Sequence, residues 1–214
     1  MVSVEIREKN QLVDGAFDEK EQQQIRDAIK NKYQDVSQSA DGLFRYQTGK
    51  AGAAALGYDA SILDGIPEGA LSSFCGVGNP FSVESIAVGS HILDIGCGAG
   101  FDLLVASTIV GSGGRVRGVD LTEEMVSKAR SFISEFAGST ISVEHISSES
   151  LPYDDNSFDH VISNGVFNLS PCKLALFREV RRVLRPGGCL QFADIVLVRE
   201  PPPGTTGSVE GWSQ

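Results

Sequence analysis

Residues 92–100 read Ile-Leu-Asp-Ile-Gly-Cys-Gly-Ala-Gly, and this stretch decides the fold of the chain. A second apolar segment follows and ends at Val119-Asp120, about twenty positions later. A buried strand that runs into a glycine-rich turn, with a carboxylate at the end of the next strand, is typical of α/β sheets that bind nucleotide-like ligands. The stretch therefore predicts a parallel sheet with such a ligand at its carboxyl edge.

The spacing of the glycines separates two classes of ligand. A dinucleotide fingerprint counted from Gly96 and Gly98 requires a third glycine at position 101, which is Phe101 here. The glycine stands at position 100 instead, and Asp94 has no counterpart in that fingerprint. A nicotinamide oxidoreductase is therefore disfavoured, although glycine-rich turns also bind NAD, FAD and simple phosphates.

The composition is that of a globular, acidic chain. Its 214 residues are 41% hydrophobic and 21% charged, and the formal net charge is −10 at pH 7. This size favours one domain with a sizeable core, and the negative charge disfavours nucleic acid as a partner. No apolar run approaches the roughly 20 residues of a membrane span, and no signal peptide is visible. The four cysteines form no CxxC pair and are typical of reduced thiols. Together these features lead us to expect a cytoplasmic protein without a membrane partner.

Strands and helices alternate along the central part of the chain, which indicates a doubly wound, mostly parallel sheet of the Rossmann-like type. The expected strands are residues 91–95, 115–120, 141–146, 158–163 and 189–198. The expected helices begin at Phe101, after Thr122 and at Ser170. The predicted apolar face of the last helix consists of Leu174, Phe177, Val180 and Leu184.

The flanking segments suggest three parts. We expect an N-terminal helical cap over residues 1–46, with an amphipathic helix at 19–36, a core over 47–198 and a flexible tail over 199–214. Residues 37–90 are rich in Gly, Ala and Ser, and they are expected to form short helical turns that lie over the mouth of the sheet.

The order Asp94-x-Gly96-x-Gly98-x-Gly100 resembles the cofactor loop of S-adenosylmethionine (SAM)-dependent methyltransferases. Across roughly residues 46–198, further motifs resemble the arsenite methyltransferase branch of that superfamily. These motifs are Leu56-Gly57-Tyr58, Ile66-Pro67-Glu68-Gly69-Ala70, Gly76-Val77-Gly78-Asn79-Pro80, Ser163-Asn164-Gly165-Val166-Phe167-Asn168-Leu169-Ser170, Arg182-Val183-Leu184-Arg185-Pro186-Gly187-Gly188 and Asp194-Ile195-Val196. The resemblance implies the methyltransferase sheet of seven strands. Only five are visible, so the last helix and the antiparallel hairpin are lacking, and we expect either a fragment or an edge covered by a partner.

The resemblance also implies where SAM binds. Gly96, Gly98 and Gly100 would let the backbone approach the methionyl part, whose carboxylate suits the helix N-terminus near Phe101. Asp120, with Leu121 beside it, would accept hydrogen bonds from both ribose hydroxyls.

Five polar residues complete the predicted cofactor site. Ser147 stands where these enzymes usually have an acidic residue against the adenine amine, so Ser148, through its backbone amide, and Glu149 are the candidates that follow it. Glu149 also fits a surface loop. Asn164 would face the cleft at the carboxyl edge, or serve a structural turn, and Asn79 would belong to a lid over the cofactor.

Phe44, Tyr46 and Tyr58 could present aromatic faces to the sulfonium, or simply pack within the cap.

The resemblance does not extend to an arsenic site. Arsenite enzymes of this type bind As(III) through cysteines, and two of those positions are Val77 and Gly165 here. Cys75 and Cys172 are nearby alternatives, but isolated cysteines usually pack as small hydrophobic residues, as we expect for Cys97. No metal site is predicted.

The sequence thus favours a SAM-dependent methyltransferase that acts on a small-molecule acceptor and releases S-adenosylhomocysteine. The acceptor would be arsenite or another thiophilic or lone-pair nucleophile. No catalytic residue is assigned, because His145 and His160 lie in or beside strands and no general base is evident. The alternative is a SAM-binding or truncated methyltransferase-like domain without turnover. The sequence does not determine the oligomeric state.

Overall fold

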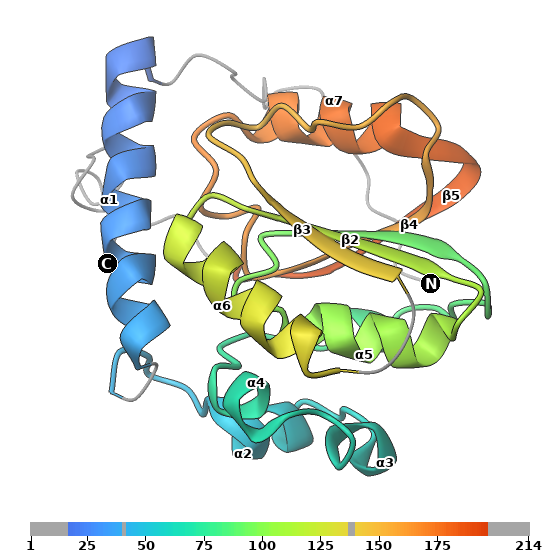
Figure 1. The fold of residues 1–214 in the computed structure, drawn as a ribbon. Helices are drawn as coiled ribbons and strands as arrows, with labels where there is room; N and C mark the ends of the chain where they lie inside the picture. Colours follow the sequence, from blue (N-terminus) through green and yellow to red (C-terminus); the bar gives the residue numbers. More distant parts are fainter. Residues whose placement is uncertain (1–16, 40–41, 137–139, 197–214) are drawn as a thin grey trace.

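The computed structural model describes residues 17–39, 42–136 and 140–196, and it shows a five-stranded parallel sheet between layers of helices (Figure 1). The strand order is β3-β2-β1-β4-β5, with every neighbouring pair parallel. The strands are β1 (His91–Ile95), β2 (Arg115–Asp120), β3 (Thr140–His145), β4 (Phe158–Asn164) and β5 (Leu184–Ala193). The predicted fold class is confirmed.

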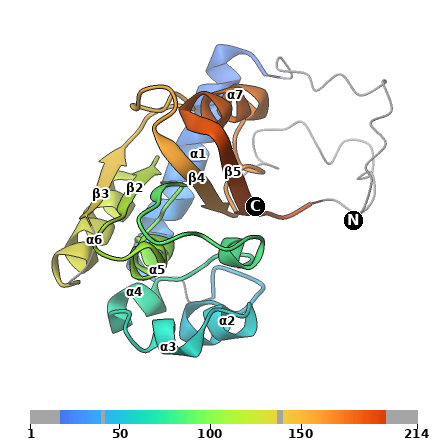
Figure 2. The same cartoon turned by 90° about the vertical axis from the view of Figure 1, so that its right-hand side faces the viewer.

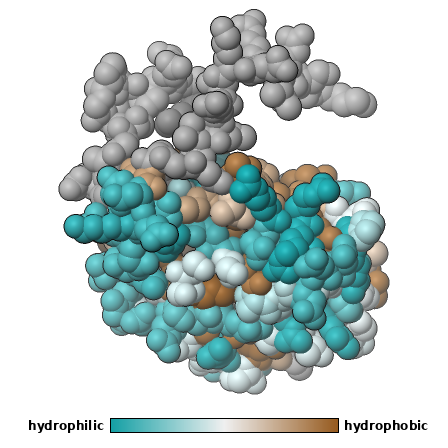
Figure 3. All heavy atoms as spheres, turned by 90° about the horizontal axis from the view of Figure 1, so that it is seen from above, coloured by the Kyte–Doolittle hydropathy of each residue, from teal (hydrophilic) through white to brown (hydrophobic). Residues whose placement is uncertain are grey.

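Both faces of the sheet are buried, which explains why the strands read as apolar runs. On one face Ile92 packs with helices α5 (Phe101–Val110) and α6 (Glu123–Ser134). On the other face Leu93 packs with helix α7 (Lys173–Val183). Seen from the side of α7, the described surface is mostly hydrophilic with scattered apolar side chains (Figure 3).

Helix α7 turns a different stripe towards the sheet from the one predicted. Its buried residues are Leu176, Val180 and Val183, whereas Phe177 is 38% exposed. The helix begins at Lys173, not at Ser170. The predicted stripe was therefore about one position out, because the periodicity alone could not show which of two overlapping apolar rows meets the sheet.

The last strand begins earlier than predicted. Strand β5 starts at Leu184, which pairs with Phe158, and the next pair joins Cys189 to His160 across an irregularity. Pro186-Gly187-Gly188 thus lies in a bulged part of the strand and does not precede it. The strand ends at Ala193, and it forms the edge of the described sheet. The expected tail, 199–214, lies outside the described residues.

The short helices of residues 37–90 do not lie over the mouth of the sheet as expected. Helices α2 (Gly49–Ala55), α3 (Ala60–Leu63) and α4 (Glu68–Ser72) pack against α5, on the side away from the sheet (Figure 2). Their apolar side chains form one cluster with Phe101, Leu104 and Val105. Two other segments of this stretch reach the cavity at the carboxyl edge: residues 43–46, and the segment between α4 and the 3₁₀ turn η1 (Pro80–Ser82).

Helix α1 (Glu19–Gln38) covers the carboxyl edge of the sheet and packs beside α6. Asp18 begins it with a capping box that includes Glu21. Gln34 donates to Glu124 of α6 over 2.7 Å, and Lys128 donates to the carbonyl of Ser37 over 2.9 Å. None of the helices in the described ranges is long and apolar enough to cross a bilayer.

The loop between α5 and β2 provides a test of the packing. Gly113 and Gly114 are neighbours, but a Cβ on Gly114 would lie 2.3 Å from Val110 Cγ2, whereas a Cβ on Gly113 would meet nothing closer than 3.9 Å. We expect Gly114→Ala to lower the free energy of unfolding by about 1–3 kcal/mol, because overpacking displaces α5. Gly113→Ala should change it by less than about 0.5 kcal/mol. Urea denaturation measures both, and equal losses would contradict this account.

Candidate functional site

A cavity of about 620 Å³ opens at the carboxyl edge of the sheet. Ile95, Asp120 and Asn164, at or next to the ends of β1, β2 and β4, line its floor, and α1 lines the opposite wall. The carboxyl edge is where ligands bind in open α/β sheets, at the point where the strand order reverses. Here that point lies between β1 and β4. The glycine loop after β1 therefore lies where a ligand is expected.

The three glycines of the loop have different surroundings although all three have positive φ. A Cβ on Gly96 would lie 2.3 Å from Val166 Cγ2, and one on Gly100 would lie 3.1 Å from Ala129 Cβ. A Cβ on Gly98 would meet no atom within 4 Å, and Gly98 lines the cavity. Gly96 and Gly100 thus allow close packing of the protein, whereas Gly98 leaves backbone open to a ligand.

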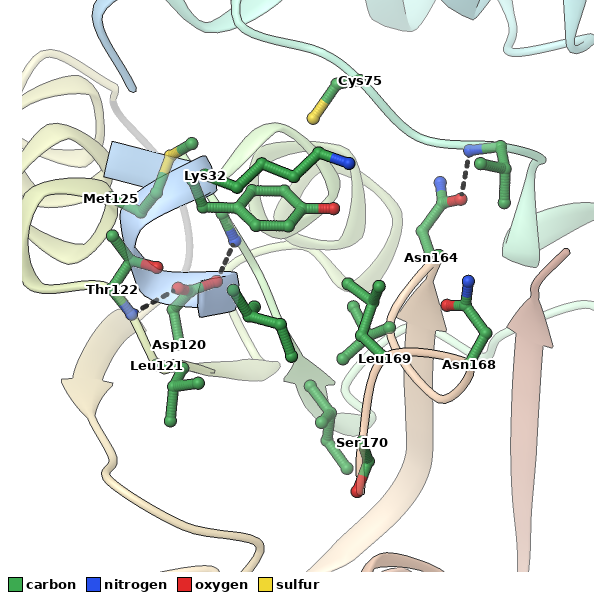
Figure 4. Close-up of a pocket in the computed structure, with 18 of the residues that line it drawn as sticks. Lys32, Cys75, Asp120, Leu121, Thr122, Met125, Asn164, Asn168, Leu169 and Ser170 are labelled. Carbon is green, nitrogen blue, oxygen red and sulfur yellow. Dashed lines mark hydrogen bonds between the residues drawn. The ribbon is translucent and has the colours of Figure 1, made fainter. Parts of the chain in front are cut away.

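Asp120 joins the glycine loop to the start of α6. One carboxylate oxygen accepts the Gly98 amide and the other accepts the Thr122 amide, both over 2.8 Å (Figure 4). Burial raises the pKa of Asp120, while these two hydrogen bonds lower it. The carboxylate lines the cavity and retains acceptor capacity beyond these two bonds, because each oxygen can accept more than one hydrogen bond.

Asp94 lies beneath the loop and does not line the cavity. It is 2% exposed, and its Oδ2 atom has no hydrogen-bond partner within the part of the chain that the structure describes. Burial raises the pKa of Asp94 well above its usual value, and the nearby Asp102 and Asp120 raise it further. Burial also raises the pKa of Asp102 to about 6.

These observations test whether the residues fit SAM. Three buried carboxylates with raised pKa values favour a cationic ligand, and SAM carries a sulfonium and an ammonium group. The open backbone at Gly98 lets a ligand come close to the loop, and the Asp120 carboxylate can accept hydrogen bonds from a ribose diol. The residues present therefore fit the cofactor.

Asn164 is occupied by protein partners. Its amide oxygen accepts from Val77 N at 2.8 Å and Gly78 N at 3.2 Å (Figure 4). Its amide nitrogen lies within hydrogen-bond distance of Gly78 O, Asp102 Oδ2 and Tyr58 Oη. Asn164 thus fixes the segment that follows α4 over the carboxyl edge. In this structure it positions a wall of the cavity.

The loop after β3 contributes two of its three predicted residues to the cavity. Ser148 and Glu149 line it, and Ser147 does not. Glu149 is not a free surface carboxylate, because Arg26 of α1 pairs with it over 2.6 Å and both side chains are 12% exposed. The Ser170 hydroxyl donates to the other Glu149 oxygen over 2.9 Å. This network ties α1 to the sheet.

Two other predicted residues lie outside the lining. Asn79 caps η1 by accepting from the Phe81 amide, and it donates to the carbonyl of Gly57 over 3.1 Å. Gly100 begins α5. Leu121, Phe44 and Tyr46 line the cavity, whereas Tyr58 is buried in the α2–α4 cluster.

Sequence reasoning missed the part that α1 takes in the site. Four residues of this helix line the cavity: Arg26, Ile29, Lys32 and Tyr33. Their spacing along one face of an amphipathic helix was visible, but it indicates equally well a helix that simply packs on the core. Burial raises the pKa of Tyr33, and Cys75 and Tyr46 raise it further.

The cysteines do not gather in the cavity. Cys75 lines it, and burial raises the pKa of its thiol to about 12. Cys97 is buried beneath the loop, and the Cys172 sulfur lies 3.8 Å from Arg26. A Cβ on Gly165 would lie 3.5 Å from the methyl groups of Val77, so these two positions face each other. Within the described ranges no group of three or more His, Cys, Asp or Glu side chains could hold a metal ion.

Comparison with known proteins agrees with this geometry. The profile of a family described as a methyltransferase domain matches residues 86–212. An arsenite methyltransferase from Halobacterium salinarum is 39% identical over 174 residues, which cover 78% of this chain and 44% of that protein. A demethylmenaquinone methyltransferase from Shouchella clausii is 37% identical over 110 residues, or 50% of this chain and 46% of that protein.

A solved structure is also similar. The arsenic(III) S-adenosylmethionine methyltransferase from Chlamydomonas reinhardtii superimposes with a TM-score of 0.57 at 32% identity, and the match covers 74% of this chain and 53% of that one. The chain spans less than half the length of the curated relatives it matches.

The buried carboxylates predict an unusual pH dependence in the ligand-free protein. Since their pKa values are raised, the folded state binds protons that the unfolded chain, with an aspartate pKa of about 3.9, does not bind. Their contribution to the free energy of unfolding therefore increases as pH falls from about 7 to about 4. We expect Asp94→Asn to raise this free energy by about 1–3 kcal/mol at neutral pH and by little at about pH 4.

Asp154→Asn, at an exposed carboxylate, is the matched control. Denaturant titrations across this pH range measure the effect. A loss of stability in Asp94→Asn that is equal at both pH values would contradict the electrostatic account.

Proposed function

We propose that this chain, which belongs to the methyltransferase domain family, binds SAM in the carboxyl-edge cavity and transfers its methyl group to a small-molecule acceptor. The product of the cofactor is then S-adenosylhomocysteine. The observation that carries the proposal is the open backbone at Gly98, which Asp120 holds, together with the buried Asp94 carboxylate, whose Oδ2 atom has no hydrogen-bond partner among the described residues. This arrangement favours a ligand that is both a nucleoside and a cation.

Each side of the cavity has a role in this proposal. Asp120 accepts the ribose hydroxyls with its remaining lone pairs, and Leu121 and Ser148 border the adenine. Asp94 and Asp102 balance the positive charge from beneath the loop. SAM supplies a methyl group on a positively charged sulfur, which is already a good leaving group. The task of the protein is to align the acceptor and exclude water.

We assign no general base among the described lining residues, because Asp120 is assigned to the ribose and Glu149 is paired with Arg26. The Tyr33 hydroxyl and the Cys75 thiol both have raised pKa values, so they are protonated at neutral pH. His145 bonds the carbonyl of Leu121, and His160 bonds Gln191, and neither lines the cavity. The acceptor therefore brings its own lone pair, as thiolates, amines and As(III) do.

Arsenite itself fits this cavity less well than a thiolate or an amine, which needs no cysteine ligands. Val77 and Gly165 face each other where the resemblance to arsenite methyltransferases implies a pair of cysteines, and a Cβ on Gly165 would lie 3.5 Å from the Val77 methyl groups. As(III) is a thiophilic centre that thiolates bind, and Cys75 is the one cysteine among the described residues that line the cavity. The presence of Val77 and Gly165 in place of these cysteines also favours the second candidate function, which is SAM binding without methyl transfer.

The ribose assignment has a direct test. We expect Asp120→Ala to weaken SAM binding by about 1.5–3 kcal/mol in calorimetric titration, because a charged acceptor is lost. Glu123→Ala removes an exposed carboxylate three residues away and should leave the affinity unchanged. Thermal melting of the variants checks that the loop is intact. Wild-type affinity in a folded Asp120→Ala protein would refute the assignment.

Turnover separates the two candidate functions. We expect the wild-type protein to show a thermal shift with SAM but not with NAD, and to form S-adenosylhomocysteine when it is incubated with thiol or amine acceptors. Chromatography of the nucleosides measures the product. Tight SAM binding without product from a panel of thiols, amines and arsenite would support the binding-only role.

A further inference from the structure

The charges around the cavity are divided between two sides. Asp120 lies on the floor, with Asp94 and Asp102 buried beneath it. Glu149 does not add to this negative charge, because Arg26 pairs with it over 2.6 Å. The cationic side consists of two residues, Lys32 of α1 and Arg45 of the segment that follows it.

Lys32 reaches into the cavity, and no carboxylate of the described residues pairs with it. Figure 4 shows its side chain extending from α1 over the floor that Asp120 and Asn164 line. Across residues 17–39, 42–136 and 140–196, neither Lys32 nor Arg45 makes an ion pair. Apart from Arg45, the described lining between α1 and the segment after α4 is uncharged: it consists of Tyr33, Leu43, Phe44, Tyr46, Ser73, Cys75 and Val77.

An unpaired ammonium group in a mostly apolar cavity favours an anionic ligand, because charge pairing is stronger where water is excluded. SAM does not need this group. Its net charge of about +1 suits the acidic floor, and its carboxylate suits the N-terminus of the ten-residue helix α5 beside the glycine loop.

We infer that Lys32, with Arg45 beside the same opening, selects an acceptor that carries a carboxylate in addition to its lone-pair nucleophile. This inference rests on the proposed function and narrows its substrate class. The carboxylate pairs with Lys32, and the nucleophile, a thiolate for example, points towards the floor. Pairing at a remote group leaves the lone pair of the nucleophile free to react.

The transfer step balances without a proton. The thiolate lone pair forms the new sulfur–methyl bond, and the bond between the methyl carbon and the sulfonium sulfur breaks. Its electron pair stays on that sulfur, which becomes the neutral thioether of S-adenosylhomocysteine. The acceptor loses one negative charge, and its carboxylate remains paired with Lys32 until the product leaves.

The experiment compares two thiols that differ in one group. Mercaptoacetate carries a carboxylate, and mercaptoethanol carries a hydroxyl in its place. Each is titrated calorimetrically into the protein saturated with S-adenosylhomocysteine, and methyl transfer to each is then measured with SAM. The variants are Lys32→Ala, Lys32→Arg as the conservative replacement, and Lys30→Ala, which removes the same charge from the same helix outside the cavity lining.

We expect the wild type to favour mercaptoacetate over mercaptoethanol by about ten- to a hundredfold in affinity and in kcat/KM. Lys32→Ala should abolish this preference and leave mercaptoethanol and SAM binding unchanged. Lys32→Arg should retain most of it, and Lys30→Ala all of it. The inference is wrong if the wild type does not distinguish the thiols, or if Lys32→Ala weakens SAM binding instead, which would assign the lysine to the carboxylate of the cofactor.

The two proposals fail in different ways. If the wild-type protein does not bind SAM, the proposed function is wrong, and the inference that rests on it is wrong as well. If SAM binds and is turned over with both thiols equally, the proposed function stands and the carboxylate subsite is refuted. The binding titrations with S-adenosylhomocysteine do not depend on turnover, so they test the subsite even in a protein that only binds the cofactor.

Discussion

The carboxylate of Asp120 holds together the parts of the molecule on which the site depends. It ends β2 and accepts the backbone amides of Gly98 and Thr122, so one side chain sets both the glycine loop and the first turn of α6. The loop in turn packs Gly96 on Val166 and Gly100 on Ala129. A carboxylate buried to this degree is unfavourable unless cationic or hydrogen-bonding partners surround it. The negative charge of the cluster that Asp120 forms with Asp94 and Asp102 therefore complements the positive charge of a cationic ligand.

The second wall of the cavity comes from helix α1, far away in the sequence. The Arg26–Glu149 pair and the hydrogen bonds to α6 attach this helix across the open edge of the sheet. The helix brings Lys32 and Tyr33 into the cavity lining, on the side that we propose for the acceptor. If the acceptor is the anion that we infer, a positively charged cofactor and a negatively charged acceptor each meet a surface of opposite sign, which favours specificity.

Membership of the methyltransferase domain family explains why the cofactor side is easier to assign than the acceptor side. The relatives reported above are named for arsenite and for demethylmenaquinone, so similar sheets serve different acceptors. The elements around the acceptor side are α1 and the segments beside it, and such connecting segments vary more readily than the sheet that supports them. The facing pair Val77 and Gly165 is one place where this chain departs from the arsenite pattern.

The parallel sheet could be predicted from the amino-acid sequence, because the glycine loop and the alternation of strands and helices are local patterns that need no knowledge of distant contacts. The sequence also placed Asp120 and Gly98 at the carboxyl edge, since both directly follow strands or end them. Only the tertiary structure decided what depends on long-range contacts. The face of α7 that meets the sheet differed by about one position from the predicted stripe. Strand β5 begins at Leu184, because the neighbouring strand selects among registers that look equivalent in sequence. Likewise, Asn164 binds residues 86 and 87 positions away, and Lys32 enters the cavity because α1 crosses the sheet edge. No local pattern records which distant segment will provide the other half of such a contact.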